Sequence, residues 1–119
     1  MRRQSKYRAV PTTVNGITFA SKAEARRYRE LLLLGDAGEV RNLELQPRFA
    51  LSVSGERVCE YVADFRYEQR VIRCGLRTAT VTDVWLPIVE DVKGIRTPVY
   101  RLKKKLMKAC YGIDVQEVR

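Results

Sequence analysis

Apolar residues recur every three or four positions in two segments of the chain, and this spacing predicts two helices. The first is expected to begin after Ser21, which is a good N-cap and has a glutamate three residues later, as in a capping box. It is expected to end at Gly35. The second is expected to have Thr97 as N-cap and Pro98 as its first residue, and to end at Gly112.

Period-two alternation and turn signals predict the strands between and after these helices. The Asn-Gly pair at 15–16 and the Ser-Gly pair at 54–55 each indicate a hairpin turn. Residues 35–47 are expected to be a connection, and residues 69–84 either extend the second hairpin or form a protruding loop. The expected strands cover residues 17–19, 49–53, 57 to about 68, 86–93 and 113–118.

From the first helix onward the predicted order is α-β-β-β-α-β. The expected fold is α/β in the broad sense, an α+β arrangement with a four-stranded mixed sheet flanked by helices. The step from residue 86 through the second helix to residue 118 is expected to be a right-handed crossover between parallel strands. The apolar face expected for that helix consists of Val99, Leu102, Leu106, Ala109 and Cys110.

The 119 residues are enough for one domain, which we place at residues 14–119 after a basic arm at residues 1–13. With 23 Lys and Arg against 14 Asp and Glu, the net charge is +9 and clustered. Such clusters favour a nucleic-acid partner over a merely solvated surface. The expected nucleic-acid contacts are Arg2, Arg3, Lys6, Arg8, Arg101, Lys103, Lys104, Lys105 and Lys108.

Histidine is absent, which excludes Ser-His and Cys-His nucleophile pairs and a histidine general base. The three cysteines, Cys59, Cys74 and Cys110, are widely spaced, and their number is odd. We expect packing roles for them and a reducing, cytoplasmic location. There is neither a signal-peptide pattern nor an apolar run of the roughly 18 residues that a membrane span requires. No membrane partner is therefore expected.

The candidate chemistry lies on the expected strand 86–93. Alternation places Asp91 and Lys93 on one face, about 6–7 Å apart along the strand, while Glu90 faces away. Asp64 lies among apolar neighbours on the preceding strand. Two carboxylates and a lysine would suit Mg²⁺ and a phosphate. The residues alone also allow a simple ion pair between Asp91 and Lys93, with Asp64 on an exposed face.

The chain resembles the PD-(D/E)XK nuclease superfamily, and within it a family of small phage and prophage proteins. The resemblance depends on the expected order of helices and strands and on five sequence segments. The resemblance runs from about residue 14 to residue 118 and implies a restriction-endonuclease-like core. The matching segments are residues 19–28, 45–49, 61–65, 89–94 and 100–106.

The resemblance implies roles for individual residues. Asp64 corresponds to the metal-binding aspartate, and Asp91 and Lys93 correspond to the acid-x-Lys pair of the superfamily. Glu24 corresponds to the glutamate of the first helix that can complete the metal shell. The Val92 carbonyl joins the expected metal ligands.

The same resemblance implies a Mg²⁺-dependent endodeoxyribonuclease of phage origin, with Mn²⁺ able to substitute. Gln46 matches a glutamine beside the site in some relatives and is counted with the nucleic-acid contacts, whereas Ala63 replaces the superfamily's usual proline. Small size favours selectivity for branched DNA, as in a Holliday-junction resolvase of DNA recombination, and a homodimer. A nicking or repair endonuclease, a non-catalytic nucleic-acid-binding module and a basic structural protein stay open as alternatives.

Overall fold

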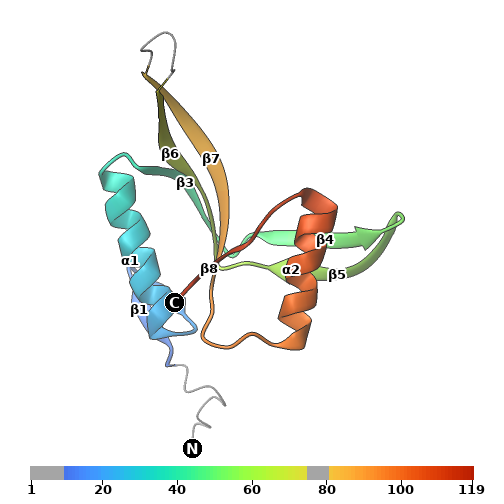
Figure 1. Cartoon of the computed structure of the whole chain (residues 1–119). Helices are drawn as coiled ribbons and strands as arrows, with labels where there is room; N and C mark the ends of the chain where they lie inside the picture. The colour runs from blue at the N-terminus through green and yellow to red at the C-terminus, as the bar shows by residue number, and fades with distance from the viewer. Residues whose placement is uncertain (1–9, 75–80) are drawn as a thin grey trace, which may run out of the picture.

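The computed structural model describes residues 10–74 and 81–119, and the two helices and eight strands found there are shown in Figure 1. Neither of these helices is long and apolar enough to cross a membrane. In chain order the elements are β1 (Thr12–Val14), β2 (Ile17–Phe19), α1 (Lys22–Asp36), β3 (Val40–Leu45), β4 (Arg48–Val53), β5 (Glu56–Val62), β6 (Phe65–Cys74), β7 (Val81–Val92), α2 (Pro98–Tyr111) and β8 (Gln116–Val118).

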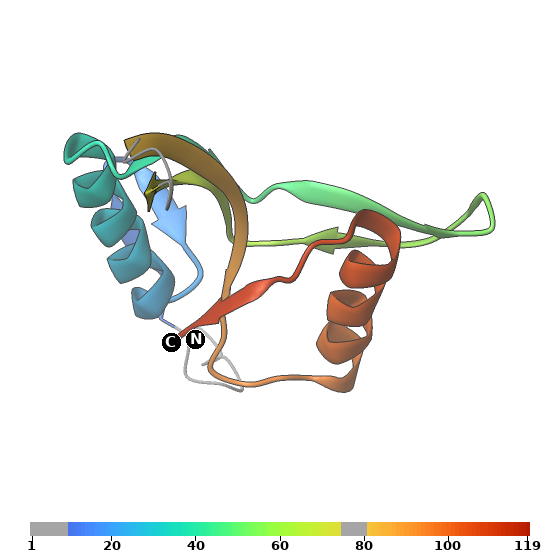
Figure 2. The ribbon, with the colours of Figure 1, turned by 45° about the horizontal axis from the view of Figure 1, so that its top comes forward.

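A four-stranded mixed sheet forms the centre, with strand order β3-β6-β7-β8. The β3–β6 and β6–β7 pairs are antiparallel, and β7–β8 is parallel. The predicted mixed sheet is therefore confirmed, as is the parallel pair joined through the second helix. The β1–β2 and β4–β5 hairpins are separate two-stranded sheets, and the β4–β5 hairpin projects beyond α2 in Figure 2.

The two helices lie on opposite sides of β7 (Figure 2). Ile88 and Val92 pack with the buried residues on the α1 side, whereas Val89 packs with those on the α2 side. Because side chains alternate along a strand, each face of β7 thus contributes to a different apolar cluster. The first cluster is Val14, Phe19, Ala25, Tyr28, Leu31, Val40, Phe65 and Tyr67; the second is Phe49, Leu51, Tyr61, Ala63, Val89, Tyr100, Met107 and Val115.

Helix α1 begins as predicted and ends later than predicted. The Ser21 hydroxyl accepts a hydrogen bond from the Glu24 amide at 3.2 Å. The helix continues through Gly35 to Asp36, so the prediction that Gly35 ends it is wrong. The chain reverses direction between α1 and β3 at Gly38 instead. Its φ of +78° lies in the left-handed region that glycine adopts without strain.

Three strand predictions need correction. Residues 40–45, expected to lie in a connection, form β3, which is an edge strand of the sheet. Only one residue of β3 is buried, so its sequence lacks the alternation of apolar and polar residues that predicts a strand. The expected long strand from 57 to 68 is broken between β5 and β6, so Asp64 lies at a bend rather than inside a strand. The arm predicted for residues 1–13 ends earlier, because β1 begins at Thr12.

The segment 69–84 does not extend the hairpin that turns at residues 54–55, as one of the two alternatives had it; its described residues, 69–74 and 81–84, lie in β6 and β7. These residues belong to the β6–β7 hairpin, in which Cys74 at the end of β6 pairs with Val81 at the start of β7. Residues 75–80 lie outside the described part of the chain. The later part of β7 then carries the candidate site.

Helix α2 has the predicted ends, with the Thr97 hydroxyl accepting from the Tyr100 amide at 3.1 Å and Gly112 at φ +69°. Its predicted apolar face is wrong. Val99 and Leu102 are 62% and 58% exposed, and Ala109 and Cys110 are also exposed. Only Leu106 of that set is partly buried. The helix instead packs on β4 with the face that carries Tyr100 and Met107, because these two large side chains fill the second cluster.

Candidate active site

Asp64 and Asp91 lie side by side, although they are 27 positions apart in the sequence. The bend between β5 and β6 is fixed by backbone hydrogen bonds: the Asp64 amide donates to the Glu90 carbonyl at 3.2 Å, and the Gln46 amide donates to the Asp64 carbonyl at 3.0 Å. Oδ2 of Asp64 accepts from the Val92 amide at 2.7 Å. The bend therefore turns the Asp64 carboxyl toward β7, where it meets Asp91.

The proximity of the two carboxyls changes the protonation of Asp64. Burial raises the pKa of Asp64 to about 8, and the hydrogen bond to Asp91 and the charge of Asp91 act in the same direction. The Val92 amide opposes this by stabilising the ionised form. In the absence of a cation, the pair therefore holds a proton at neutral pH.

Asp91 is almost completely buried and has two partners. The Tyr61 hydroxyl donates to its Oδ2, and Lys93 Nζ lies 3.5 Å from its Oδ1. Burial, followed by the hydrogen bond to Asp91, raises the pKa of Tyr61, so this hydroxyl stays a donor. The shared face predicted for Asp91 and Lys93 is thus confirmed. Tyr61, which sequence reasoning missed, is the residue that orients the Asp91 carboxylate.

Lys93 is held by a ring as well as by a carboxylate. Its Nζ lies 4.4 Å from the centre of the Tyr100 ring, within the range of a cation–π interaction. The side chain is 29% exposed. Lys93 therefore has a fixed position and an accessible ammonium.

Glu24, in the first turn of α1, lies between two pockets. One, of about 500 Å³, is also lined by Val92 and Lys93, and the other, of about 200 Å³, by Gln46 and Asp64. Burial raises the pKa of Glu24; the charge of Asp91 adds to this and that of Lys93 opposes it. The structure thus brings Glu24 and Gln46 to the edge of the site.

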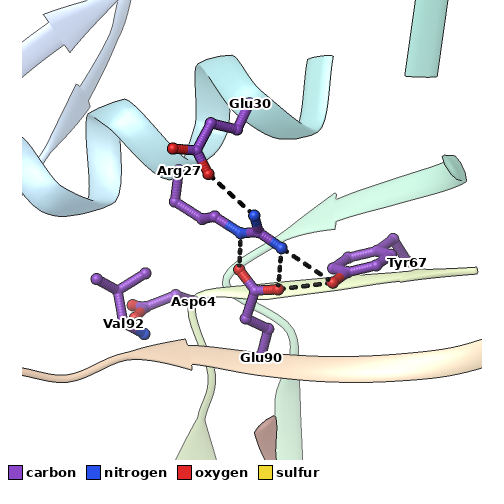
Figure 3. Close-up of polar contacts among 6 residues, drawn as sticks. All are labelled: Arg27, Glu30, Asp64, Tyr67, Glu90 and Val92. Carbon is purple, nitrogen blue, oxygen red and sulfur yellow. Dashed lines mark hydrogen bonds and ion pairs between the residues drawn. The ribbon is translucent and has the colours of Figure 1, made fainter. Parts of the chain in front are cut away.

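Glu90, next to Asp91 in sequence, points toward Arg27 of α1 (Figure 3). Arg27 of α1 donates to both of its carboxylate oxygens, Nε to Oε1 at 2.6 Å and an Nη to Oε2 at 3.0 Å. The Tyr67 hydroxyl also donates to Oε2, at 2.6 Å. The prediction that Glu90 faces away from Lys93 is confirmed. The Arg27–Glu90 pair fastens α1, and with it Glu24, to the strand that carries Asp91.

The predicted nucleic-acid contacts divide into three groups. Arg2, Arg3, Lys6 and Arg8 lie outside the described residues. On α2, Lys104 pairs with Glu117 at 2.5 Å and Lys108 with Asp114 at 2.8 Å. Within residues 10–74 and 81–119, no ion pair is found for Arg101, Lys103 or Lys105. The charge available on α2 is therefore smaller than the sequence suggests.

The donor set of the site suits Mg²⁺. Within the described ranges, no group of three or more His, Cys, Asp or Glu side chains is close enough to form a ready metal cluster. Mg²⁺ is commonly held by one or two carboxylates together with waters and substrate phosphates. Asp64 and Asp91 offer such a pair, and the charge of a divalent cation would offset the burial and the proximity of Asp91 that now keep a proton on Asp64. Glu24 and the Val92 carbonyl lie at the same end of β7.

Comparison with known proteins identifies one family. Residues 4–118 match the family described as "Protein of unknown function (DUF1064)", so the chain belongs to it. No curated protein matches the chain. No solved structure matches it either.

Proposed function

We propose that this protein is a Mg²⁺-dependent endodeoxyribonuclease of the PD-(D/E)XK type. The observation that carries the proposal is the meeting of Asp64, Asp91 and Lys93 at one point, with the lysine ammonium 3.5 Å from Asp91. The four-stranded mixed sheet, whose parallel pair β7–β8 is joined through α2, supports this proposal. An ion pair without further function would not require a second buried carboxyl against Asp91, since that carboxyl is costly to ionise there.

Each residue of the site has a distinct task in phosphodiester hydrolysis. Asp64 and Asp91 would hold Mg²⁺, which neutralises developing charge and lowers the pKa of a bound water. The Tyr61 hydroxyl and the Val92 amide fix one oxygen of each carboxylate, so the remaining oxygens are presented in fixed directions. Lys93, steadied by the Tyr100 ring, would donate a hydrogen bond to the attacking water or to a phosphate oxygen.

Branched DNA is the substrate that we propose, and a homodimer the working form, in the cytoplasm of a bacterial host. The described chain offers one such site, and resolving a four-way junction needs two coordinated cuts. A two-fold dimer would supply both. Mn²⁺ should support the same reaction, because it accepts the same oxygen ligands.

The deciding experiment compares cleavage of linear, nicked, flapped and four-way-junction DNA with Mg²⁺ and with EDTA. Wild type should cut in Mg²⁺, and Asp91→Asn should not. Asp83→Asn is a matched control, because Asp83 is an exposed carboxylate on β7, the strand of Asp91, and pairs with Arg70 of β6. If wild type binds DNA and cuts none of the four substrates, the chain is a non-catalytic nucleic-acid-binding module.

A further inference from the structure

Two adjoining hollows beside α2 form a single groove that starts at the candidate site. They measure about 300 and 390 Å³, and they share Arg96, Arg101 and Glu117. The first reaches Lys93, and the second extends along α2 to Lys108. Seven basic and two acidic side chains line the groove. Its charge and its direction suit an extended polyanion that leads away from Lys93.

Glu117 is one of the two acids, and it occupies the centre of the groove. In the parallel pairing of β7 and β8 it lies beside Asp91. Its carboxylate receives the Lys104 ammonium at 2.5 Å and the Arg96 guanidinium at 2.6 Å. The hydrogen bond from Lys104 lowers the pKa of Glu117, and the charges of Lys104 and Arg96 add to this. Two cations of the groove are thus already neutralised in the free protein.

Tyr100 supplies an unused donor in the same groove. Its side chain lines the second hollow and is 6% exposed. Within the described residues, its buried hydroxyl makes no hydrogen bond of good geometry, although the Glu117 carboxylate lies close enough to add to the effect of burial in raising the pKa of Tyr100. A buried hydroxyl without a partner is unusual and costs free energy. A ligand oxygen that takes the place of the Glu117 carboxylate would accept this hydrogen bond.

We propose that the groove binds the phosphodiester backbone of a nucleic acid, with one phosphate accepting from the Tyr100 hydroxyl and replacing Glu117 as partner of Arg96 and Lys104. A phosphate offers these donors the same kind of charged oxygen that the carboxylate offers now. Glu117 therefore competes with the ligand and lowers its affinity. The identity of the ligand rests on the proposed nuclease function, whereas the groove and its competing acid do not.

The first test measures binding of labelled duplex DNA, and of duplex RNA of equal length, by fluorescence anisotropy in EDTA. Glu117→Gln should tighten binding about two- to fivefold, the scale of a charge pair near the protein surface. Each cation that it frees should steepen the log–log salt dependence by about 0.9. Glu44→Gln is the matched control, because it removes an exposed acid that pairs with Arg66 outside the groove.

The second test uses Tyr100→Phe, which removes only the unused hydroxyl. It should weaken binding about tenfold, the scale of a hydrogen bond to a charged group, without lowering the melting temperature. Tyr111→Phe is the control for the substitution itself. The Tyr111 hydroxyl donates to the Ala50 carbonyl at 2.5 Å, so this change should lower stability and leave affinity unaltered.

The proposal is overturned if Glu117→Gln binds both duplexes no better than Glu44→Gln, or if Tyr100→Phe binds as wild type does. If only one of the two duplexes, DNA or RNA, is bound with an affinity that changes in these variants, that duplex is the ligand of the groove. Cleavage in Mg²⁺ is measured separately. If the nuclease hypothesis is wrong, the two variants should change DNA affinity as expected but the protein should not cleave DNA. If the groove proposal is wrong, the protein should cleave DNA but the two variants should not change its affinity in this way.

Discussion

Lys93 and Asp91 form an ion pair at the end of β7, with Nζ 3.5 Å from Oδ1. Their spacing of two residues puts both side chains on one face of the strand. The pair is useful for chemistry because it is not isolated: Asp64 meets Asp91 from the bend between β5 and β6, and Tyr100 lies beneath the lysine. The predictions below test what each of these neighbours does.

The two carboxylates should be indispensable for cleavage. Asp64→Asn and Asp91→Asn should each lower the cleavage rate by at least about 100-fold, the scale of losing a main electrostatic group. DNA binding should persist, because each change removes a negative charge. Cleavage of supercoiled plasmid, followed on gels with Mg²⁺, checks this. A variant that still cuts at the wild-type rate removes its residue from the site.

Lysines of the site and of α2 should behave differently. Lys93→Ala should abolish turnover and leave affinity nearly unchanged. Lys105→Ala should weaken binding to all sequences and reduce the slope of log affinity against log salt by about 0.9. Single-turnover rates and binding titrations at several salt concentrations separate the two effects. Equal behaviour of both variants would contradict the assigned roles.

The stability of the metal-free protein should depend on pH through Asp64. Its pKa is raised to about 8 in the folded chain, so the folded state holds a proton that the unfolded state releases. The resulting stabilisation is complete below pH ~4 and is lost as pH rises through about 8. The measurement is the difference in melting temperature between wild type and Asp64→Asn in EDTA. This difference should therefore shift against wild type as the pH is raised from 6 to 9. Asp83→Asn should retain the wild-type pH dependence.

Mg²⁺ should raise the melting temperature of wild type at pH 8, because a cation that binds only the folded protein stabilises it by mass action. Asp64→Asn and Asp91→Asn should lose most of this increase. Differential scanning fluorimetry over a range of Mg²⁺ concentrations measures it. An equal increase in Asp91→Asn would place the cation elsewhere.

The Arg27–Glu90 pair should matter for both stability and activity. Arg27→Met leaves the Glu90 carboxylate buried with the Tyr67 hydroxyl as its remaining partner, which should cost about 3 kcal/mol, the lower end of the range for breaking a buried pair. Arg27→Met combined with Glu90→Leu should recover most of that stability. Chemical denaturation measures both variants. If the pair also positions Glu24, the double variant should still cleave more slowly than wild type despite its restored stability.

Local chemistry was enough to predict several features of this protein from its sequence. The Ser21 and Thr97 caps act through hydrogen bonds to amides three residues away, so the helix starts follow from neighbouring residues. The shared face of Asp91 and Lys93 follows from strand alternation alone. The Asn15-Gly16 turn likewise depends on two adjacent residues that both adopt positive φ.

Contacts between distant segments decided the rest. The bend at Asp64 depends on backbone hydrogen bonds to Gln46 and Glu90, which no local pattern contains. The buried face of α2 was set by packing on β4, where Tyr100 and Met107 fit the cluster and the more regular stripe of Val99 and Leu102 was left exposed. Tertiary structure thus determined which carboxyl meets Asp91 and which tyrosine supports Lys93, because burial and charge depend on neighbours that only the folded chain brings together.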